Sequence, residues 1–194
     1  MIGEIVETTT LGFRAGSQEL HRPPALGELV KVRHQGRDHW YAVVLYSTTG
    51  AEAGRHVVRR ATPDVRDEAI YRENPQLQRL LHTLFEARLV GWREEDRLWQ
   101  TVPPLPPPLH YSVYSCTAEE VADFSERLHY FRLLVDPPPP LPAEQVLAAH
   151  IRHVYVRRGY DDEWLTRAAR EVASLLKEDH ARLLSLLYAI DPER

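Results

Sequence analysis

The sequence predicts an α+β fold: a small antiparallel β-barrel at the N-terminus, with a short helical insertion, followed by an α-helical C-terminal region. Three segments place proline or glycine directly before or inside an alternating apolar run, which is typical of short strands joined by tight turns: 1–8, 24–32 and 103–114. Beyond four consecutive prolines at 137–140, apolar residues recur at helical spacing. We expect four regions: a barrel (1–116), a connecting helix (117–135), a proline-rich linker (136–141) and a helical region (142–194).

The first 60 residues contain three apolar segments that we predict to be strands. They centre on Ile5, Val30 and Val43, and polar or glycine- and proline-containing stretches separate them. Gly36 lies among polar residues between the second and third segments. This composition indicates a hairpin turn that joins two antiparallel strands.

A helical insertion is expected at 64–81, where acidic residues precede helix formers and Pro75 interrupts the pattern. Alternation of apolar and polar residues returns at 85–92 and predicts a further strand. The proline-rich segment 103–108 lacks most of the amide donors that a sheet interior needs. We therefore expect it to be an extended, rigid connector to a last barrel strand at 112–116.

A capping box at Thr117–Glu120 predicts the start of a helix that runs to about Leu134. Asp136 and the four prolines then form a stiff spacer, because each proline restricts the backbone. The region behind this spacer is expected to be held away from the barrel or docked on it at a fixed angle.

The C-terminal region is predicted to be helical, because leucine, isoleucine, valine and alanine recur there at helical spacing. Gly159 is suited to ending the first helix, and Asp161 or Asp162 to capping the second. The pattern leaves open whether a third helix starts at Asp179 or the second continues through it.

Bulk composition favours a soluble globular protein. Of 194 residues, 43% are hydrophobic and 27% are charged, and the formal net charge is -4. These values are ordinary for a folded domain and give no overall attraction to nucleic acid or anionic lipid. The single cysteine, Cys116, cannot form an intramolecular disulfide, and no apolar run approaches the length of a membrane span. We therefore expect a cytoplasmic protein without membrane contact.

Six of these segments occur in an order that resembles a known barrel: Ile2–Val6, Pro24–Val32 with Gly27 and Glu28, Tyr41–Tyr46, Asn74–Pro75, Val90–Gly91, and the prolines before Val113–Tyr114. Together they resemble the HAS barrel, the N-terminal barrel of HerA-type DNA-translocating ATPases, which is related to the barrel of rotary ATP synthase subunits. The resemblance covers roughly residues 1–116. In the full-length family the barrel helps subunits form a ring and offers a surface to a partner nuclease.

The ATPase motor of that family has no counterpart in this sequence. A phosphate-binding loop requires Gly-x-x-x-x-Gly-Lys-Ser/Thr, and none of the nine glycines is followed by lysine. The resemblance therefore carries over no ATP hydrolysis, no cofactor and no catalytic residue. It implies instead a non-catalytic protein-binding or assembly module that acts as an adaptor to a DNA-processing ATPase or nuclease.

The candidate partner-binding residues lie at the start of the barrel and near the end of the chain. Ile2 and Glu4 begin the barrel edge, and Leu183 and Leu187 share one face of a C-terminal helix. The C-terminal helices contain many apolar residues for a region that a rigid spacer separates from the barrel. Self-association or partner binding through these helices is therefore expected. No catalytic, cofactor-binding or metal-binding residue is predicted.

Two alternatives stay open. Arg55, Arg59 and Arg60 form a basic patch, and with the aromatic residues of the barrel half they suit a nucleic-acid-binding barrel. A metal-dependent hydrolase would use a histidine cluster such as His150 and His153, which lie three residues apart. The neighbouring arginines make that segment cationic, which disfavours a divalent ion.

Overall fold

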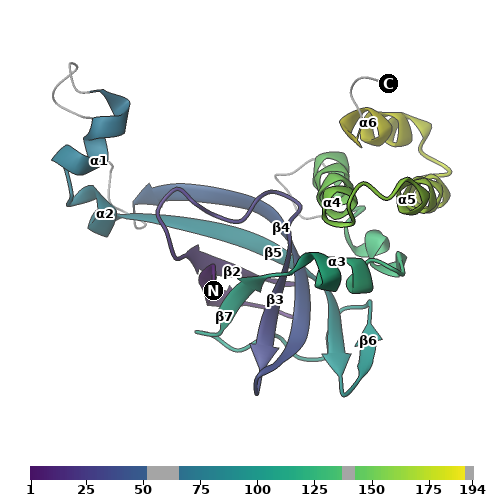
Figure 1. Cartoon of the computed structure of the whole chain (residues 1–194), viewed down its shortest axis with the longest axis horizontal. Helices are drawn as coiled ribbons and strands as arrows, with labels where there is room; N and C mark the ends of the chain where they lie inside the picture. Colours follow the sequence, from purple (N-terminus) through teal and green to yellow (C-terminus); the bar gives the residue numbers. More distant parts are fainter. Residues whose placement is uncertain (52–65, 137–142, 191–194) are drawn as a thin grey trace.

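A closed antiparallel barrel forms the N-terminal half of the computed structural model, which describes residues 1–51, 66–136 and 143–190 (Figure 1). Its strands are β1 (Gly3–Thr8), β2 (Gly12–Ser17), β3 (Leu29–His34), β4 (Arg37–Ala51), β5 (Leu81–Glu94) and β7 (Ser112–Ser115). They pair in the order β2-β1-β7-β3-β4-β5, and pairing of β2 with β5 closes the ring. Strand β6 (Arg97–Trp99) extends the sheet as a hairpin with β5. The predicted fold of a barrel followed by helices is confirmed.

Strand β2 is not among the strands that the apolar pattern singles out. Its sequence, GFRAGS, contains two glycines, and glycine weakens a strand signal. Space requires a glycine at position 12, because a Cβ atom there would lie 2.5 Å from the carbonyl oxygen of Ala87 on β5. The close pairing that closes the barrel therefore needs glycine, the residue type that makes β2 hard to recognise in the sequence.

Strand β4 is buried on both faces from Trp40 to Leu45, which explains its continuous apolar run. Ala42 and Val44 belong to the cluster inside the barrel, whereas Tyr41, Val43 and Leu45 belong to a second cluster shared with the helices. A strand covered on both faces loses the alternation of apolar and polar residues that marks a half-exposed strand. Strand β4 thus forms a wall common to both cores.

The proline-rich segment 103–108 lies outside the sheet and packs over Trp40. The indole Nε1 of Trp40 donates a hydrogen bond of 3.0 Å to the carbonyl oxygen of Leu105. Pro103 and Pro107 are buried. The segment then leads to β7, as expected for a connector to the last barrel strand.

Strands β4 and β5 continue past the barrel as a two-stranded arm (Figure 1). The pairing of β2 with β5 ends at Leu84, whereas β4 and β5 stay paired as far as Ala51 and Leu81. The tip of the arm carries η1 (Asp67–Ala69), α1 (Ile70–Glu73) and α2 (Leu77–Leu80). The predicted helical insertion is confirmed, and its interruption falls at Asn74–Pro75.

Helix α3 (Ala118–Phe124) begins at the predicted capping box. The hydroxyl of Thr117 accepts from the amide of Glu120, whose carboxylate accepts from the amide of Thr117. The prediction that this helix reaches Leu134 is wrong, because α3 ends at Phe124 and a separate 3-10 helix, η2, spans His129–Leu133.

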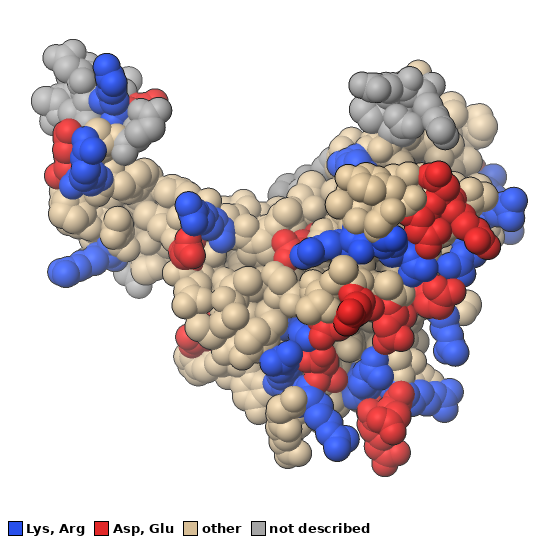
Figure 2. Space-filling view, in the orientation of Figure 1, with Lys and Arg blue, Asp and Glu red and all other residues tan. Residues whose placement is uncertain are grey.

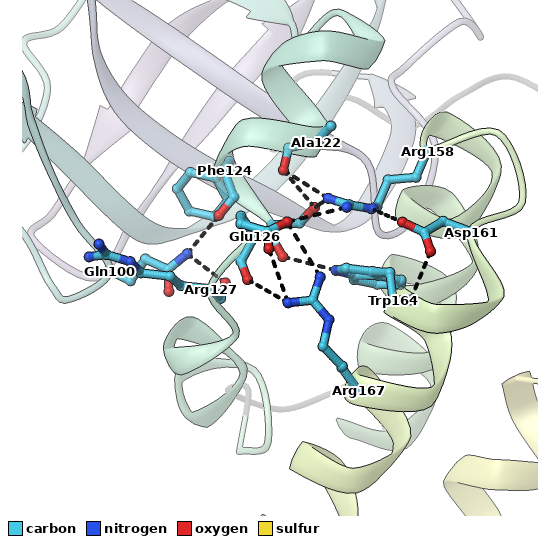
Figure 3. Close-up of polar contacts among 10 residues, drawn as sticks. Gln100, Ala122, Phe124, Glu126, Arg127, Arg158, Asp161, Trp164 and Arg167 are labelled. Carbon is cyan, nitrogen blue, oxygen red and sulfur yellow. Dashed lines mark hydrogen bonds and ion pairs between the residues drawn. The ribbon is translucent and has the colours of Figure 1, made fainter.

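Tertiary hydrogen bonds explain the early end of α3 (Figure 3). The carbonyl oxygen of Phe124 accepts from Gln100 at 2.7 Å, and that of Ser125 accepts from the Trp164 indole at 2.9 Å. A longer helix would need these carbonyls for its own amides four residues on. Side chains distant in sequence thus replace the helical hydrogen bonds.

The described residues 143–190 form three helices: α4 (Ala143–Arg157), α5 (Asp162–Leu175) and α6 (His180–Ile190). Gly159 has a φ of +71° after α4, and the carboxylate of Asp161 accepts from the amide of Trp164 at 2.9 Å, as a helix cap does. Asp179 accepts from the amide of Arg182 at 3.1 Å. Asp179 therefore caps a third helix, which answers the question that the sequence left open.

Helix α4 docks directly on the barrel through His150, which is fully buried. Its Nδ1 lies 2.8 Å from the carbonyl oxygen of Gly27, and its Nε2 lies 2.8 Å from the hydroxyl of Tyr130. A carbonyl can only accept, so Nδ1 carries the proton and Nε2 accepts from Tyr130. Of the predicted linker 136–141, only Asp136 lies within the described residues.

Candidate functional site

A groove of about 670 Å³ lies between the three C-terminal helices. Its lining residues come from α4 (Arg152, Tyr155), α5 (Asp162, Leu165, Thr166, Ala169, Arg170, Ala173) and α6 (Leu183, Leu187, Ile190). Most of the lining side chains are apolar or small, and the charged ones lie toward helix ends or outer faces. The groove is therefore shaped and composed for an apolar ligand with polar flanks.

The two walls of the groove follow from how α5 and α6 pack. Helix α5 buries Trp164, Ala168 and Val172, so the neighbouring face with Ala169 and Ala173 stays accessible. These two alanines lie four residues apart and leave the groove open because they have short side chains.

Helix α6 is the least covered of the three. It buries Leu186, whereas Leu184, Leu187 and Tyr188 are 47%, 39% and 66% exposed. Three large apolar side chains exposed on one short helix, beside a groove, mark an interaction surface.

Two of the four predicted partner-binding residues meet in this groove. Leu183 and Leu187 both line it, one turn apart on α6. The contribution of α5 was missed, because an alanine at helical spacing reads equally well as part of a buried face. The spacing of Ala169 and Ala173 was the available signal, and it does not reveal which face of α5 is covered.

Ile2 and Glu4 lie on the barrel, and β1 is not an open edge there. Strand β1 pairs with β2 on one side and β7 on the other. The amide of Ile2 donates to the carbonyl of Val113 at 2.8 Å, and the carboxylate of Glu4 lies 2.7 Å from Nδ1 of His110. A partner at this position would contact side chains rather than add a strand.

A second, polar cavity of about 1060 Å³ lies between the β5–β6 hairpin, α3 and η2. Several of its charged groups are already paired. Arg93 lies 3.3 Å from Asp123, and the carboxylate of Glu126 accepts from Arg158 at 3.2 Å and Arg167 at 3.1 Å.

Arg158, just after α4, and Arg167 on α5 attach these two helices to Glu126 in the segment that follows α3 (Figure 3). Hydrogen bonding to Arg167 lowers the pKa of Glu126, and that of Asp161 is lowered chiefly by the amide of Trp164. Arg158 also donates to the carbonyl of Ala122 at 2.9 Å. These contacts fix the positions of α4 and α5, two of the three helices that line the apolar groove.

The residues relevant to the nucleic-acid alternative are placed only in part. Arg55, Arg59 and Arg60 lie outside the described residues. Trp40 is 5% exposed, and Trp92 and Trp99 stack on each other with ring centroids 5.9 Å apart. The outward charges on the face drawn in Figure 2 alternate between lysine or arginine and aspartate or glutamate.

The titratable residues relevant to a hydrolase have little solvent access, since Cys116 and His150 are buried and His153 is half-buried. Burial raises the pKa of the Cys116 thiol and lowers the pKa of His150 to about 3. Burial also lowers the pKa of His153. Across 1–51, 66–136 and 143–190, no group of three histidine, cysteine or acidic side chains is placed to hold a metal ion.

None of the described helices combines the length and apolar character that a bilayer span requires. Comparison with protein-family models and with curated proteins finds no match to this chain.

Proposed function

We propose that this chain is a non-catalytic protein-binding and assembly module, in which the barrel is the scaffold and the α4–α5–α6 groove receives a helix. The observation that carries the proposal is α6: Leu187 lines the groove, and Leu184 and Tyr188 lie exposed beside it. Docking an apolar helix face into such a groove is a common mode of protein recognition.

The resemblance to the HAS barrel supports a more specific role. The closed antiparallel barrel agrees with the fold that the resemblance implies. In that family the barrel serves ring assembly and nuclease binding, so we propose that the partner is a DNA-processing ring ATPase or its nuclease. The side chains of Ile2 and Glu4 remain a second predicted contact for such a partner.

The test compares two substitutions on α6. Leu187→Asp places a charge in the groove, whereas Ser185→Asp places the same charge at an exposed position of α6 that does not line it. Light scattering measures the mass of each protein alone and mixed with a purified HerA-type ATPase or its nuclease. Circular dichroism establishes that both variants are folded.

We expect wild type and Ser185→Asp to form a complex, with a second copy or with the added protein, and Leu187→Asp to lose it. If wild type stays monomeric and binds neither protein, or if Leu187→Asp behaves as wild type, the groove is not the interaction surface.

A further inference from the structure

The length of the groove matches a short helix. Its α5 wall runs from Asp162 to Ala173, which is about 16 Å at 1.5 Å per residue, or three helical turns. Its α6 wall, from Leu183 to Ile190, spans about 10 Å. A partner helix of three to four turns would cover both walls.

The cross-section of the groove also suits a helix. The α5 side presents Thr166, Ala169 and Ala173, whose small side chains let another backbone approach closely. The α6 side presents larger side chains, Leu183 and Leu187 among them, which can fit between the ridges of a partner helix. The partner therefore needs apolar residues at helical spacing along one face.

The rim of the groove selects the charge of the partner. Arg152 on α4 and Arg170 on α5 are exposed and have no ion-pair or hydrogen-bond partner among the described residues. The acidic lining residue, Asp162, already accepts a hydrogen bond of 2.6 Å from the hydroxyl of Tyr155. The tyrosine hydroxyl is neutral and cancels no charge, so two arginines against one aspartate give the rim a net positive charge, which carboxylates on the partner would complement.

A second copy of α6 does not supply that complement. From His180 to Ile190 the helix contains no aspartate or glutamate. Its exposed Leu184 and Tyr188 would suit the apolar part of the groove but would leave Arg152 and Arg170 unpaired. The charges of the rim therefore favour an acidic helix of a different chain over α6 of a second copy.

We infer that the α4–α5–α6 groove binds an acidic amphipathic helix of a partner protein, with its apolar face in the groove and its carboxylates on Arg152 and Arg170. This inference rests on the proposed function and narrows it to one chemical class of partner.

The test uses three synthetic peptides of about four helical turns and the whole chain of 194 residues. The first has leucines at helical spacing on one face and glutamates beside them. The second replaces each glutamate with lysine, and the third scrambles the first. Fluorescence anisotropy gives the dissociation constant of each at low and moderate salt.

We expect the acidic peptide to bind about tenfold more tightly than the lysine peptide at low salt, since each exposed ion pair contributes a few-fold. Added salt should shrink this difference. The double variant Arg152→Glu/Arg170→Glu should reverse the preference. Arg157→Glu, an exposed position of α4 outside the groove lining, is the matched control and should keep it.

Ala169→Leu fills the groove and should weaken binding of the acidic peptide at least tenfold. The inference is overturned if the scrambled peptide binds as well, if Ala169→Leu has no effect, or if the rim substitutions leave the preference unchanged. If the acidic and lysine peptides bind equally well and Ala169→Leu abolishes the binding of both, the groove is the binding site but does not select an acidic partner. That result would overturn the inference about charge.

Two further outcomes separate the inference from the proposed function. If no peptide binds but Leu187→Asp abolishes self-association, the occupant is a second copy and the inference fails alone. If no peptide binds and Leu187→Asp changes neither mass nor complex formation, both fail.

Discussion

Replacing Gly27 with alanine tests whether the helical region depends on its docking to the barrel. Gly27 has a φ of +81°, and a Cβ atom there would lie 2.4 Å from the backbone nitrogen of His150 and 2.5 Å from the carbonyl carbon of Ala149. Ordinary contacts between such atoms are about 3.5 Å. Helix α4 would therefore have to move by about 1 Å or the loop would have to distort.

The expected cost has three parts. A left-handed backbone costs a non-glycine residue about 1–2 kcal/mol. Overpacking against a helix backbone adds about 1–3 kcal/mol. Displacement of α4 also weakens the hydrogen bond between His150 and the Gly27 carbonyl, worth about 1 kcal/mol. We expect Gly27→Ala to lower the free energy of unfolding by about 3–6 kcal/mol in total.

Gly36→Ala is the matched control, because Gly36 has a φ of +79° and no atom within 4 Å of the added Cβ. It should cost about 1–2 kcal/mol, the backbone part alone. Urea unfolding followed by circular dichroism measures both variants. Equal losses for Gly27→Ala and Gly36→Ala would refute the docking argument, because the steric part would then be absent.

Three further predictions concern pH, nucleic acid and metal. Burial lowers the pKa of His150 to about 3, from an ordinary value of 6.5. Between these two values the unfolded chain binds a proton that the folded chain excludes. The free energy of unfolding should therefore fall by about 1.4 kcal/mol per pH unit as the pH drops from about 6.5 toward 3. Urea unfolding at several pH values should show this slope in wild type and a smaller one in His150→Gln; identical slopes would contradict it. Light scattering with a labelled single-stranded oligonucleotide should show no mass shift, whereas a salt-sensitive shift weakened by Arg59→Ala and Arg60→Ala would favour the nucleic-acid alternative. Chelator and added zinc should both leave the thermal midpoint unchanged, and a rise with zinc would revive the hydrolase alternative.

The strands marked by apolar runs next to turn residues were predictable from the sequence, and those shaped by close contacts were not. The β3–β4 hairpin around Gly36 follows from local turn chemistry. Strand β2 does not, because Gly12 serves backbone proximity to β5, a contact between segments about 70 residues apart. The end of α3 likewise depends on Gln100 and Trp164, which no local pattern connects to Phe124 and Ser125.

The candidate site was predictable on one side only. Leu183 and Leu187 stand out because large apolar residues at helical spacing exceed what a short terminal helix can bury. The facing wall depends on which side of α5 packs inward, and Trp164 decides this through its bond to Ser125. The sequence does not separate Arg152 and Arg170 from the other arginines of these helices. The structure does, because it shows that Arg158 and Arg167 form ion pairs outside the groove.

The pairing of β4 with β5 at the end of the arm affects which sequence changes this fold tolerates. Because Ala51 lies opposite Leu81 in the ladder, whatever connects them starts and finishes at neighbouring points. Doubling the length of such a connection costs only about 0.6 kcal/mol in closure entropy. Insertions and exchanges at the tip can therefore accumulate in related sequences while the barrel wall and the helical groove keep their geometry.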